Sequence, residues 1–196
     1  MEETTSIYGS HLPAMEEVQA FILSKLYEFR QEIKEETGTD PVDHTLTRIK
    51  TDESMREKCR RHSLPETEET ALFVIHDAIG LRVVCPFLND VYDMADRIEK
   101  SEDLEVVEKR DYILQAKSNG YRSLHIIVKR GIYYAEIQLR TVSQDTWAAL
   151  EHQIKYKKDV RNPDLMIREL KRCADELAST DMSMQTIRDM IREEGT

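Results

Sequence analysis

The sequence predicts one α+β domain in which a small mixed β-sheet is flanked by helices. Apolar residues recur with helical spacing near both ends, short β-rich apolar segments occupy the middle, and no linker or internal repeat divides the chain. A length of 196 residues with 40% apolar side chains suits a single domain, because domains usually contain about 100–200 residues.

The first segment predicts an amphipathic helix over about residues 13–37. Pro13 stands near its start and Gly38 just past its end, the positions where these residues favour helix initiation and termination. The apolar residues of the segment recur every three or four positions, which places them on one helix face: Val18, Ile22, Leu26, Phe29 and Ile33.

A basic segment follows at residues 48–61. If residues 50–62 form a helix, steps of four, four and three place Lys50, Ser54, Lys58 and Arg61 on one face. Like charges on one face repel each other unless an anion lies across them, so a polyphosphate would suit this surface. The alternative is a solvated basic face, which the segment on its own favours.

The middle of the chain predicts most of the sheet, and the last part predicts helices. Strands are expected at Ile79–Phe87, Glu105–Glu108, Leu124–Val128 and Ile132–Leu139, with a tight hairpin at Arg130-Gly131. Helices are expected at Asn89–Lys100, Val142–Lys155, Leu165–Ser179 and Met184–Glu193. The predicted order is therefore two helices, a strand, a helix, three strands and three helices.

Charge and cysteine content exclude several classes of protein. The chain has 28 Lys and Arg against 38 Asp and Glu, a net charge of −10, which disfavours a general nucleic-acid binder. Its three cysteines (Cys59, Cys85 and Cys173) show neither zinc-site spacing nor a disulfide framework, which suits a reducing cytoplasm. No apolar run is long enough to span a membrane, and the acidic N-terminus does not resemble a secretory signal.

An acid and an arginine flank the start of the first predicted strand. Asp77 precedes the strand, where its oxygens can bind Mg²⁺, and Arg82 can stack on a base or pair with phosphate. The alternative is that Asp77 caps a turn and that Arg82 is simply exposed.

The densest cluster of charge lies between residues 109 and 125. Basic and aromatic side chains surround a loop that ends at Asn119-Gly120: Arg110, Lys117, Tyr121, Arg122 and His125. Cations suit phosphate oxygens and a tyrosine ring suits an aromatic base, so the loop favours nucleotide binding. As an alternative, Tyr112 and Tyr121 pack in the core.

The last predicted strand has one polar side. Alternation along residues 134–141 places Glu136, Gln138 and Arg140 on the side opposite Ile137 and Leu139. Glu136 can supply a second carboxylate for Mg²⁺ or accept a proton from a nucleophilic hydroxyl. Strands with one solvated face are common, so this pattern alone is weak evidence.

Together these residues resemble the RelA/SpoT-type (p)ppGpp synthetases, and the short chain resembles the small alarmone synthetases of that family. The resemblance covers about residues 13–180. Six motifs carry it in order: Arg48-Ile-Lys50 with Ser54, Lys58 and Arg61; Asp77 with Gly80-Leu-Arg82; Arg110-Asp-Tyr-Ile113; Lys117 with Gly120-Tyr-Arg-Ser-Leu-His125; Glu136-Ile-Gln-Leu-Arg-Thr141; and Trp147-Ala with Glu151-His152 and Tyr156-Lys157.

The resemblance implies a nucleotidyltransferase-like synthetase domain that transfers pyrophosphate from ATP to the 3′-hydroxyl of GDP or GTP and releases AMP. Its catalytic core would span about residues 46–158, with helical extensions at about 13–37 and 163–194. It also implies Mg²⁺ as cofactor and a homotetramer.

The same resemblance implies a role for each matching residue. Arg48 and Arg82 would sandwich adenine, and Tyr121 would stack on guanine. Asp77 and Glu136 would bind Mg²⁺, and Glu136 would also help to deprotonate the acceptor hydroxyl. The ATP phosphates would be held by Lys50, Ser54, Lys58 and Arg61, and the acceptor and the transferring group would be oriented by Arg110, Lys117, His125 and Gln138.

Two alternatives stay open. One is a toxic relative that pyrophosphorylates adenine nucleotides or the 3′ end of tRNA, although Tyr121 favours guanine and the charge of −10 disfavours tRNA. The other is a non-catalytic nucleotide sensor, which would have lost a metal-binding carboxylate or a phosphate-binding base. The sequence shows no such loss.

Overall fold

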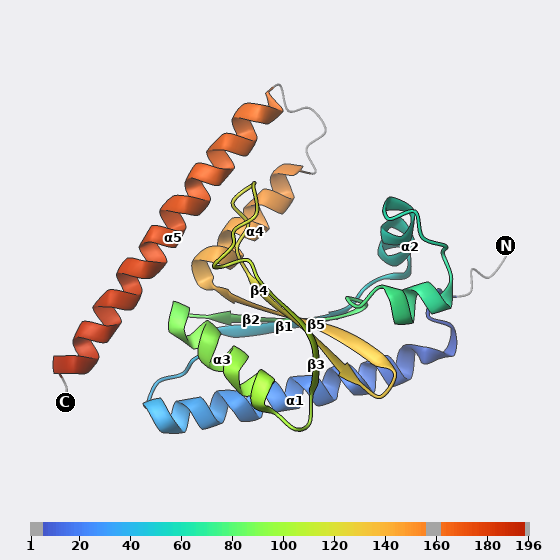
Figure 1. Ribbon diagram of the computed structural model, residues 1–196, viewed down its shortest axis with the longest axis horizontal. Helices are drawn as coiled ribbons and strands as arrows, with labels where there is room; N and C mark the ends of the chain where they lie inside the picture. Colours follow the sequence, from blue (N-terminus) through green and yellow to red (C-terminus); the bar gives the residue numbers. More distant parts are fainter. Residues whose placement is uncertain (1–5, 156–161, 195–196) are drawn as a thin grey trace.

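The computed structural model describes residues 6–155 and 162–194. Within them the strands form one five-stranded sheet in the order β1-β2-β5-β4-β3 (Figure 1). The β2–β5 pair is parallel, and the other three pairs are antiparallel. The predicted α+β fold with a mixed sheet is confirmed.

The helices and strands have the following bounds. In chain order they are η1 (Gly9–His11), α1 (Leu12–Thr37), β1 (His44–Ile49), α2 (Asp52–Arg61), η2 (Thr70–Val74), β2 (Ile79–Cys85), α3 (Leu88–Lys100), β3 (Glu105–Asp111), β4 (Leu124–Arg130), β5 (Tyr133–Thr141), α4 (Val142–Lys155) and α5 (Pro163–Glu194).

The helices α1 and α3 cover one face of the sheet (Figure 1). Ile22, Leu26 and Ile33 of α1 are buried against it, and Gly38 ends the helix in a left-handed conformation with φ 71°. Alternate strand residues such as Leu81 and Ile137 point into the same core because the side chains of a strand repeat every two residues. The opposite face of the sheet is thereby left for polar side chains.

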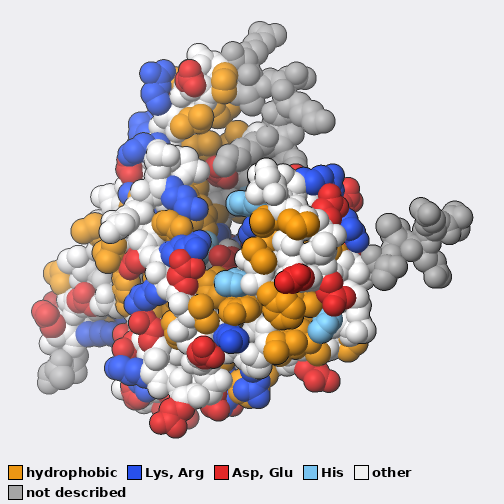
Figure 2. Space-filling model, turned by 45° about the vertical axis from the view of Figure 1, so that its right-hand side comes forward, with side chains coloured by type: hydrophobic (Ala, Val, Ile, Leu, Met, Phe, Trp, Pro, Cys, Tyr) orange, Lys and Arg blue, Asp and Glu red, His pale blue; other side chains and the backbone are white. Residues whose placement is uncertain are grey.

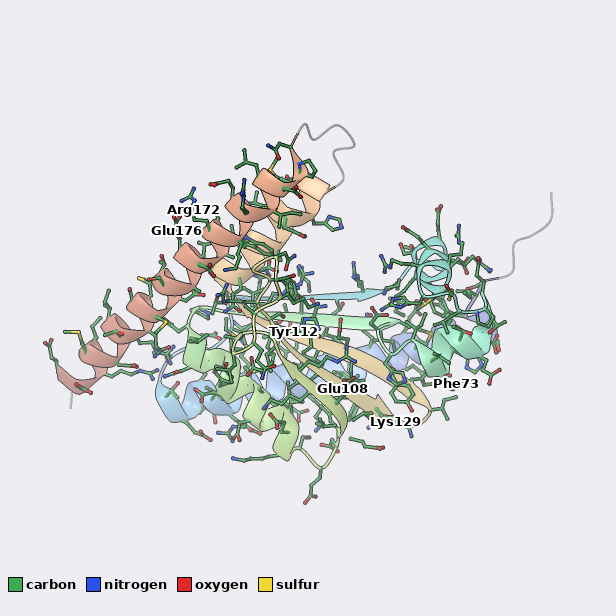
Figure 3. The ribbon with its side chains drawn as sticks, turned by 45° about the horizontal axis from the view of Figure 1, so that its top comes forward. Phe73, Glu108, Tyr112, Lys129, Arg172 and Glu176 are labelled. Carbon is green, nitrogen blue, oxygen red and sulfur yellow. The ribbon has the colours of Figure 1, made fainter. Side chains whose placement is uncertain are left out.

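The C-terminal region contains one long helix instead of the two predicted. The structure continues α5 through residues 180–183, so the prediction of separate helices at 165–179 and 184–193 is wrong. This stretch has no Gly or Pro, and Thr180 and Ser183 donate their hydroxyls to the carbonyls of Glu176 and Ser179. Arg172 and Glu176 lie on the outward side of the helix, away from the sheet (Figure 3).

Buried polar contacts join α5 to the rest of the domain. Asp181 accepts a hydrogen bond of 2.6 Å from the Thr141 hydroxyl at the end of β5. Arg188 pairs with Asp90 of α3 at 2.6 Å, and both side chains are almost fully buried. These contacts set where α5 crosses the domain.

Two further details of the predicted order are corrected. The strand β1 is absent from the predicted order because its sequence is mainly polar and mostly exposed, as expected for an edge strand. Lys50 is not in the helix that follows, since Thr51 caps α2 by accepting a hydrogen bond from the Ser54 amide. None of the described helices combines the length and apolar character needed to cross a membrane.

Asp40 connects the end of α1 to the segment that leads into β1. Its carboxylate bonds to Arg30 at 2.7 and 2.8 Å, and the Arg30 guanidinium lowers the pKa of Asp40 from 3.8 to about 2. A lowered acid pKa stabilises the fold above the unfolded-state value, and this stabilisation disappears as the pH falls from about 4 toward 2.

We therefore expect Asp40→Asn to lower the free energy of unfolding by about 1 kcal/mol at pH 6, allowing for partial exposure of the pair. The loss should shrink as urea unfolding is repeated at lower pH down to 3. Asp96→Asn, which removes an exposed pair with Lys100, is the matched control and should cost little. A loss for Asp40→Asn that is independent of pH would contradict this account.

Candidate functional site

The polar face of the sheet lines up the predicted site residues in cross-strand rows. In one row Arg48 of β1 lies opposite Gly80 of β2, which lies opposite Glu136 of β5. In the next row Arg82 pairs with Gln138, Gln138 with His125 of β4, and His125 with Arg110 of β3. Residues far apart in the sequence therefore share one surface.

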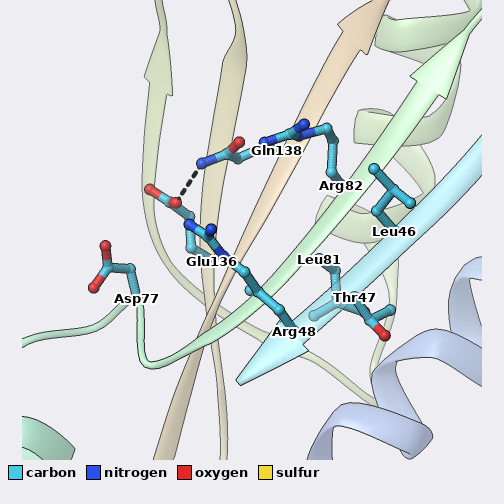
Figure 4. A pocket seen from close by; sticks show the side chains of 9 residues that line it. Leu46, Thr47, Arg48, Asp77, Leu81, Arg82, Glu136 and Gln138 are labelled. Atoms are coloured by element: carbon cyan, nitrogen blue, oxygen red, sulfur yellow. Dashed lines mark hydrogen bonds between the residues drawn. The ribbon is translucent and has the colours of Figure 1, made fainter. Parts of the chain in front are cut away.

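A cavity of about 310 Å³ opens on this face (Figure 4). It is lined by five of the predicted site residues, namely Arg48, Asp77, Arg82, Glu136 and Gln138. In Figure 2 basic and histidine side chains border a hollow between the region of α2 and that of α4 and α5. Gly80 lies on the cavity floor, where the Arg48 side chain passes over it, 3.6 Å from the position that a Cβ would take.

A second cavity of about 220 Å³ shares two residues with the first. Asp77 and Glu136 line both, so the two carboxylates stand where the cavities meet. The second cavity is also lined by the predicted residues Lys58 and Arg110. The arrangement offers space for two ligands on either side of one pair of acids.

Asp77 is bonded to two lysines through a single oxygen. Its Oδ2 accepts hydrogen bonds from Lys50 Nζ at 2.7 Å and from Lys58 Nζ at 2.6 Å. Burial alone would raise the pKa of Asp77, but the two ammonium groups hold it below its ordinary value. Its other oxygen, Oδ1, is buried and has no hydrogen-bond partner among the described residues.

Glu136 is held at both of its oxygens. His125 Nδ1 lies 2.9 Å from Oε1, and Gln138 Nε2 donates to Oε2 at 2.7 Å. Burial would raise the pKa of Glu136, but the hydrogen bonds from His125 and Gln138 keep it below its ordinary value. Glu136 is therefore an ionised acceptor with a fixed orientation.

The Tyr121 loop lies next to these groups. The Tyr121 hydroxyl is 2.8 Å from His125 Nε2, and the Lys117 ammonium lies 4.9 Å from the Tyr121 ring centre. Arg110 forms an ion pair with Glu108 at 2.6 Å, and Figure 3 labels Glu108 on β3. Lys117 and Tyr121 line neither cavity.

The remaining predicted residues lie around the edge of the site. Lys50 contacts Asp77 but lines neither cavity, while Ser54 and Arg61 are exposed on α2. Two residues of the last motif, Tyr156 and Lys157, lie outside the described residues.

Sequence reasoning gave no role to two residues that the structure places at the site. Asp145 of α4 accepts from Arg82 at 3.1 Å and from Arg140 at 3.2 Å. The signal for Arg140 was its position, two residues after Gln138 on the polar side of β5. No pattern in the sequence indicated that α4 would bring Asp145 to it.

This donor set suits a polyphosphate together with a hard divalent cation. Two carboxylates lie among lysines and arginines, and Mg²⁺ is usually bound by one or two carboxylates plus substrate phosphates. The described residues contain no group of three or more His, Cys, Asp or Glu side chains that could hold a metal by themselves. The unpartnered Oδ1 of Asp77 is compatible with a cation that arrives with a phosphate ligand.

The region found in RelA and SpoT proteins matches residues 47–161 of the chain. This range includes every residue that lines the first cavity except Leu46. The match covers more than half of the chain, and the protein therefore belongs to the RelA/SpoT family.

Two proteins of Bacillus subtilis strain 168 are similar to the chain. GTP pyrophosphokinase YwaC is 38% identical over 146 residues, which cover 70% of each chain. GTP pyrophosphokinase YjbM is 31% identical over 190 residues, covering 92% of this chain and 86% of that protein. The crystal structure of small alarmone synthetase 1 from Bacillus subtilis bound to its product pppGpp superposes with a TM-score of 0.78 at 30% identity, covering 92% of this chain and 94% of that one.

The Tyr121 loop packs against α5 through Gly120. Gly120 has φ +93°, and a Cβ there would lie 2.6 Å from the Ala174 Cβ. Arg122 of the same loop pairs with Asp175 at 2.9 Å. The position of the loop therefore depends on a close approach that only glycine permits.

We expect Gly120→Ala to destabilise the protein more than Gly131→Ala. Gly131 also has a positive φ, +60°, but nothing lies within 4 Å of a Cβ built there, so it controls for backbone strain. That strain should cost about 1 kcal/mol, and the overlap at Gly120 should add about 1–3 kcal/mol. Urea unfolding measures both variants, and equal losses would contradict the proposed packing.

Proposed function

We propose that this chain synthesises (p)ppGpp by transferring the pyrophosphoryl group of ATP to the 3′-hydroxyl of GDP or GTP, with release of AMP. The observation that carries the proposal is the pair of acids, Asp77 and Glu136, at the junction of two cation-lined cavities. Similarity to proteins named GTP pyrophosphokinase supports the same activity. The chain would thus be a GTP diphosphokinase that produces an alarmone of the stringent response.

ATP would occupy the cavity that Arg48 and Arg82 line. Their planar guanidinium groups stack on an aromatic base, and both line the same 310 Å³ space. Lys50, Lys58, Ser54 and Arg61 would then bind the phosphates. To do so, Lys50 and Lys58 exchange their contacts with Asp77 for contacts with phosphate oxygens.

This exchange leaves the Asp77 carboxylate free to bind Mg²⁺ together with Glu136. A bound Mg²⁺ would neutralise charge on the transferring phosphates. The lysines would carry the same electrostatic task on the other phosphate oxygens. Phosphate would thus replace Asp77 at the two lysines, and the metal would replace the two lysines at Asp77.

GDP or GTP would occupy the side of Tyr121 and Arg110. Tyr121 would stack on guanine once Lys117 moves from the ring to a phosphate, while Arg110, His125 and Gln138 orient the acceptor. The 3′-oxygen forms a bond to the β-phosphorus of ATP as the bond from that phosphorus to the α-phosphate oxygen breaks. AMP leaves with that oxygen, and Glu136 accepts the proton of the hydroxyl.

A homotetramer is part of the proposal. Apolar side chains of α5 are exposed in the single chain, among them Met182 at 65%, Met190 at 56% and Ile191 at 66%. Contact between copies would bury them, and native mass measures the assembly. Because all substrates are nucleotides and the cysteines are free, we place the enzyme in the cytoplasm.

We expect Asp77→Asn and Glu136→Gln each to lower transfer by at least about 100-fold, because each removes a charge from the reacting centre. The assay follows label from β,γ-labelled ATP with Mg²⁺ and with GDP, GTP, ADP or tRNA as acceptor. Asp96→Asn and Glu99→Gln, which change exposed acids of α3, are the matched controls and should keep the wild-type rate.

Label that enters a guanosine tetra- or pentaphosphate, with an equal amount of AMP, would support the proposal. Label transferred only onto ADP, as an adenosine tetraphosphate, or onto tRNA would favour the toxic relative instead. Unchanged turnover in both site variants would refute the assignment of the two acids.

A further inference from the structure

Five side chains at the site form a closed ring of hydrogen bonds. Four have been described above with separate roles: Tyr121, His125, Glu136 and Gln138. The fifth, Arg140, closes the ring because its Nη2 lies 2.5 Å from the Tyr121 hydroxyl and 2.9 Å from Gln138 Oε1. Arg140 lines neither of the two cavities.

Arg140 is a buried cation whose position is strongly fixed. Its exposed fraction is 4%, and Asp145 at 3.2 Å is its counterion. Its Nε donates to the hydroxyl of Ser123, which is fully buried. A planar guanidinium with partners on three sides cannot rotate without breaking several hydrogen bonds at once.

When the His125 imidazole is neutral, the chemistry of the two ends of the ring sets the direction of every hydrogen bond. A guanidinium can only donate, and an ionised carboxylate can only accept. One path therefore runs from Arg140 to the Tyr121 oxygen, from the Tyr121 hydroxyl to His125 Nε2, and from His125 Nδ1 to Glu136 Oε1. Along this path His125 carries its hydrogen on Nδ1.

The second path is shorter and has the same direction. Arg140 donates to Gln138 Oε1, which turns the amide nitrogen of Gln138 toward Glu136 Oε2. Both paths begin at Arg140 and end on different oxygens of Glu136. Each intermediate side chain is thus held between a donor and an acceptor, with one orientation that satisfies both.

We propose that Arg140 is a positioning residue for the transfer reaction, which fixes the orientation of Tyr121, His125 and Gln138 and, through them, of Glu136. The inference rests on the proposed function, in which Glu136 accepts the proton of the acceptor hydroxyl. Arg140 is 4% exposed and lines neither cavity, so in this proposal it acts through these side chains and not on a substrate. Without its donors, the Tyr121 hydroxyl and the Gln138 amide lose the partner that sets their direction.

The test is a double-mutant cycle between Arg140→Gln and Tyr121→Phe. Glutamine offers both a donor and an acceptor, so it does not fix the direction of the ring. Phenylalanine keeps the ring that stacks but removes the hydroxyl that joins Arg140 to His125. We expect each single change to lower kcat by about 10–100-fold, as for other residues that orient a reacting group, with little change in KM for ATP.

The double variant distinguishes positioning from a general loss of structure. If Arg140 acts through the Tyr121 hydroxyl, the double variant should be hardly slower than Arg140→Gln alone. Arg140→Lys, which keeps a donor-only cation, should recover part of kcat. Arg188→Gln is the matched control, since it removes another buried arginine paired with an aspartate, and its effect should add to that of Tyr121→Phe.

If the effects of Arg140→Gln and Tyr121→Phe on the activation free energy simply add, so that their fold losses in kcat multiply, the proposal is overturned. If Arg140→Gln does not fold, the same cycle with Arg140→Lys decides the question. The same cycle is also measured by urea unfolding without substrate. We expect the two changes to be coupled in their effects on the free energy of unfolding, and additive effects would contradict the ring of hydrogen bonds. A wild-type protein that folds but transfers no label would refute the proposed function. The unfolding cycle would still test the ring of hydrogen bonds, because it needs no substrate.

Discussion

The carboxylate of Asp77 joins Lys50, which follows β1, to Lys58 in the last turn of α2, and the rest of the site depends on this contact. Two ammonium groups so close together repel each other unless an anion lies between them. In the free protein Asp77 is that anion, so the ion pairs fix α2 against the start of β2. A phosphate group can take the same place, which makes the protein's own carboxylate a stand-in for the ligand.

The sheet supplies the second constraint. Because side chains alternate along a strand, residues such as Leu81 and Ile137 enter the core while Arg82 and Gln138 reach the opposite face. The parallel pairing of β2 with β5 places both polar residues in one row. The helices α1 and α3 cover the apolar face, so the register that builds the core also assembles the site.

Much of this arrangement could be predicted from the sequence, and the failures have physical causes. The helix α1 and the buried strands carry strong periodic patterns, and the motifs contain every residue that lines the first cavity except Leu46 and Thr47. The edge strand β1 has no such pattern because it is mostly exposed. In the middle of α5 the apolar pattern is interrupted without a Gly or Pro to end the helix, so the pattern alone does not show whether the helix continues. The role of Arg140 depends on Tyr121 and Asp145, which only the folded chain brings to it.

In the proposed reaction, Asp77 exchanges its contacts with Lys50 and Lys58 for a metal when the ATP phosphates bind. Binding of Mn²⁺, a spectroscopic substitute for Mg²⁺ at oxygen ligands, tests it directly when followed by electron paramagnetic resonance with and without a non-hydrolysable ATP analogue. We predict that, with the analogue present, the wild-type protein binds Mn²⁺ at least about tenfold more tightly than the Asp77→Asn protein does, a difference of about 1.4 kcal/mol. An equal effect of the analogue on Mn²⁺ binding in wild-type and Asp77→Asn protein would contradict the exchange.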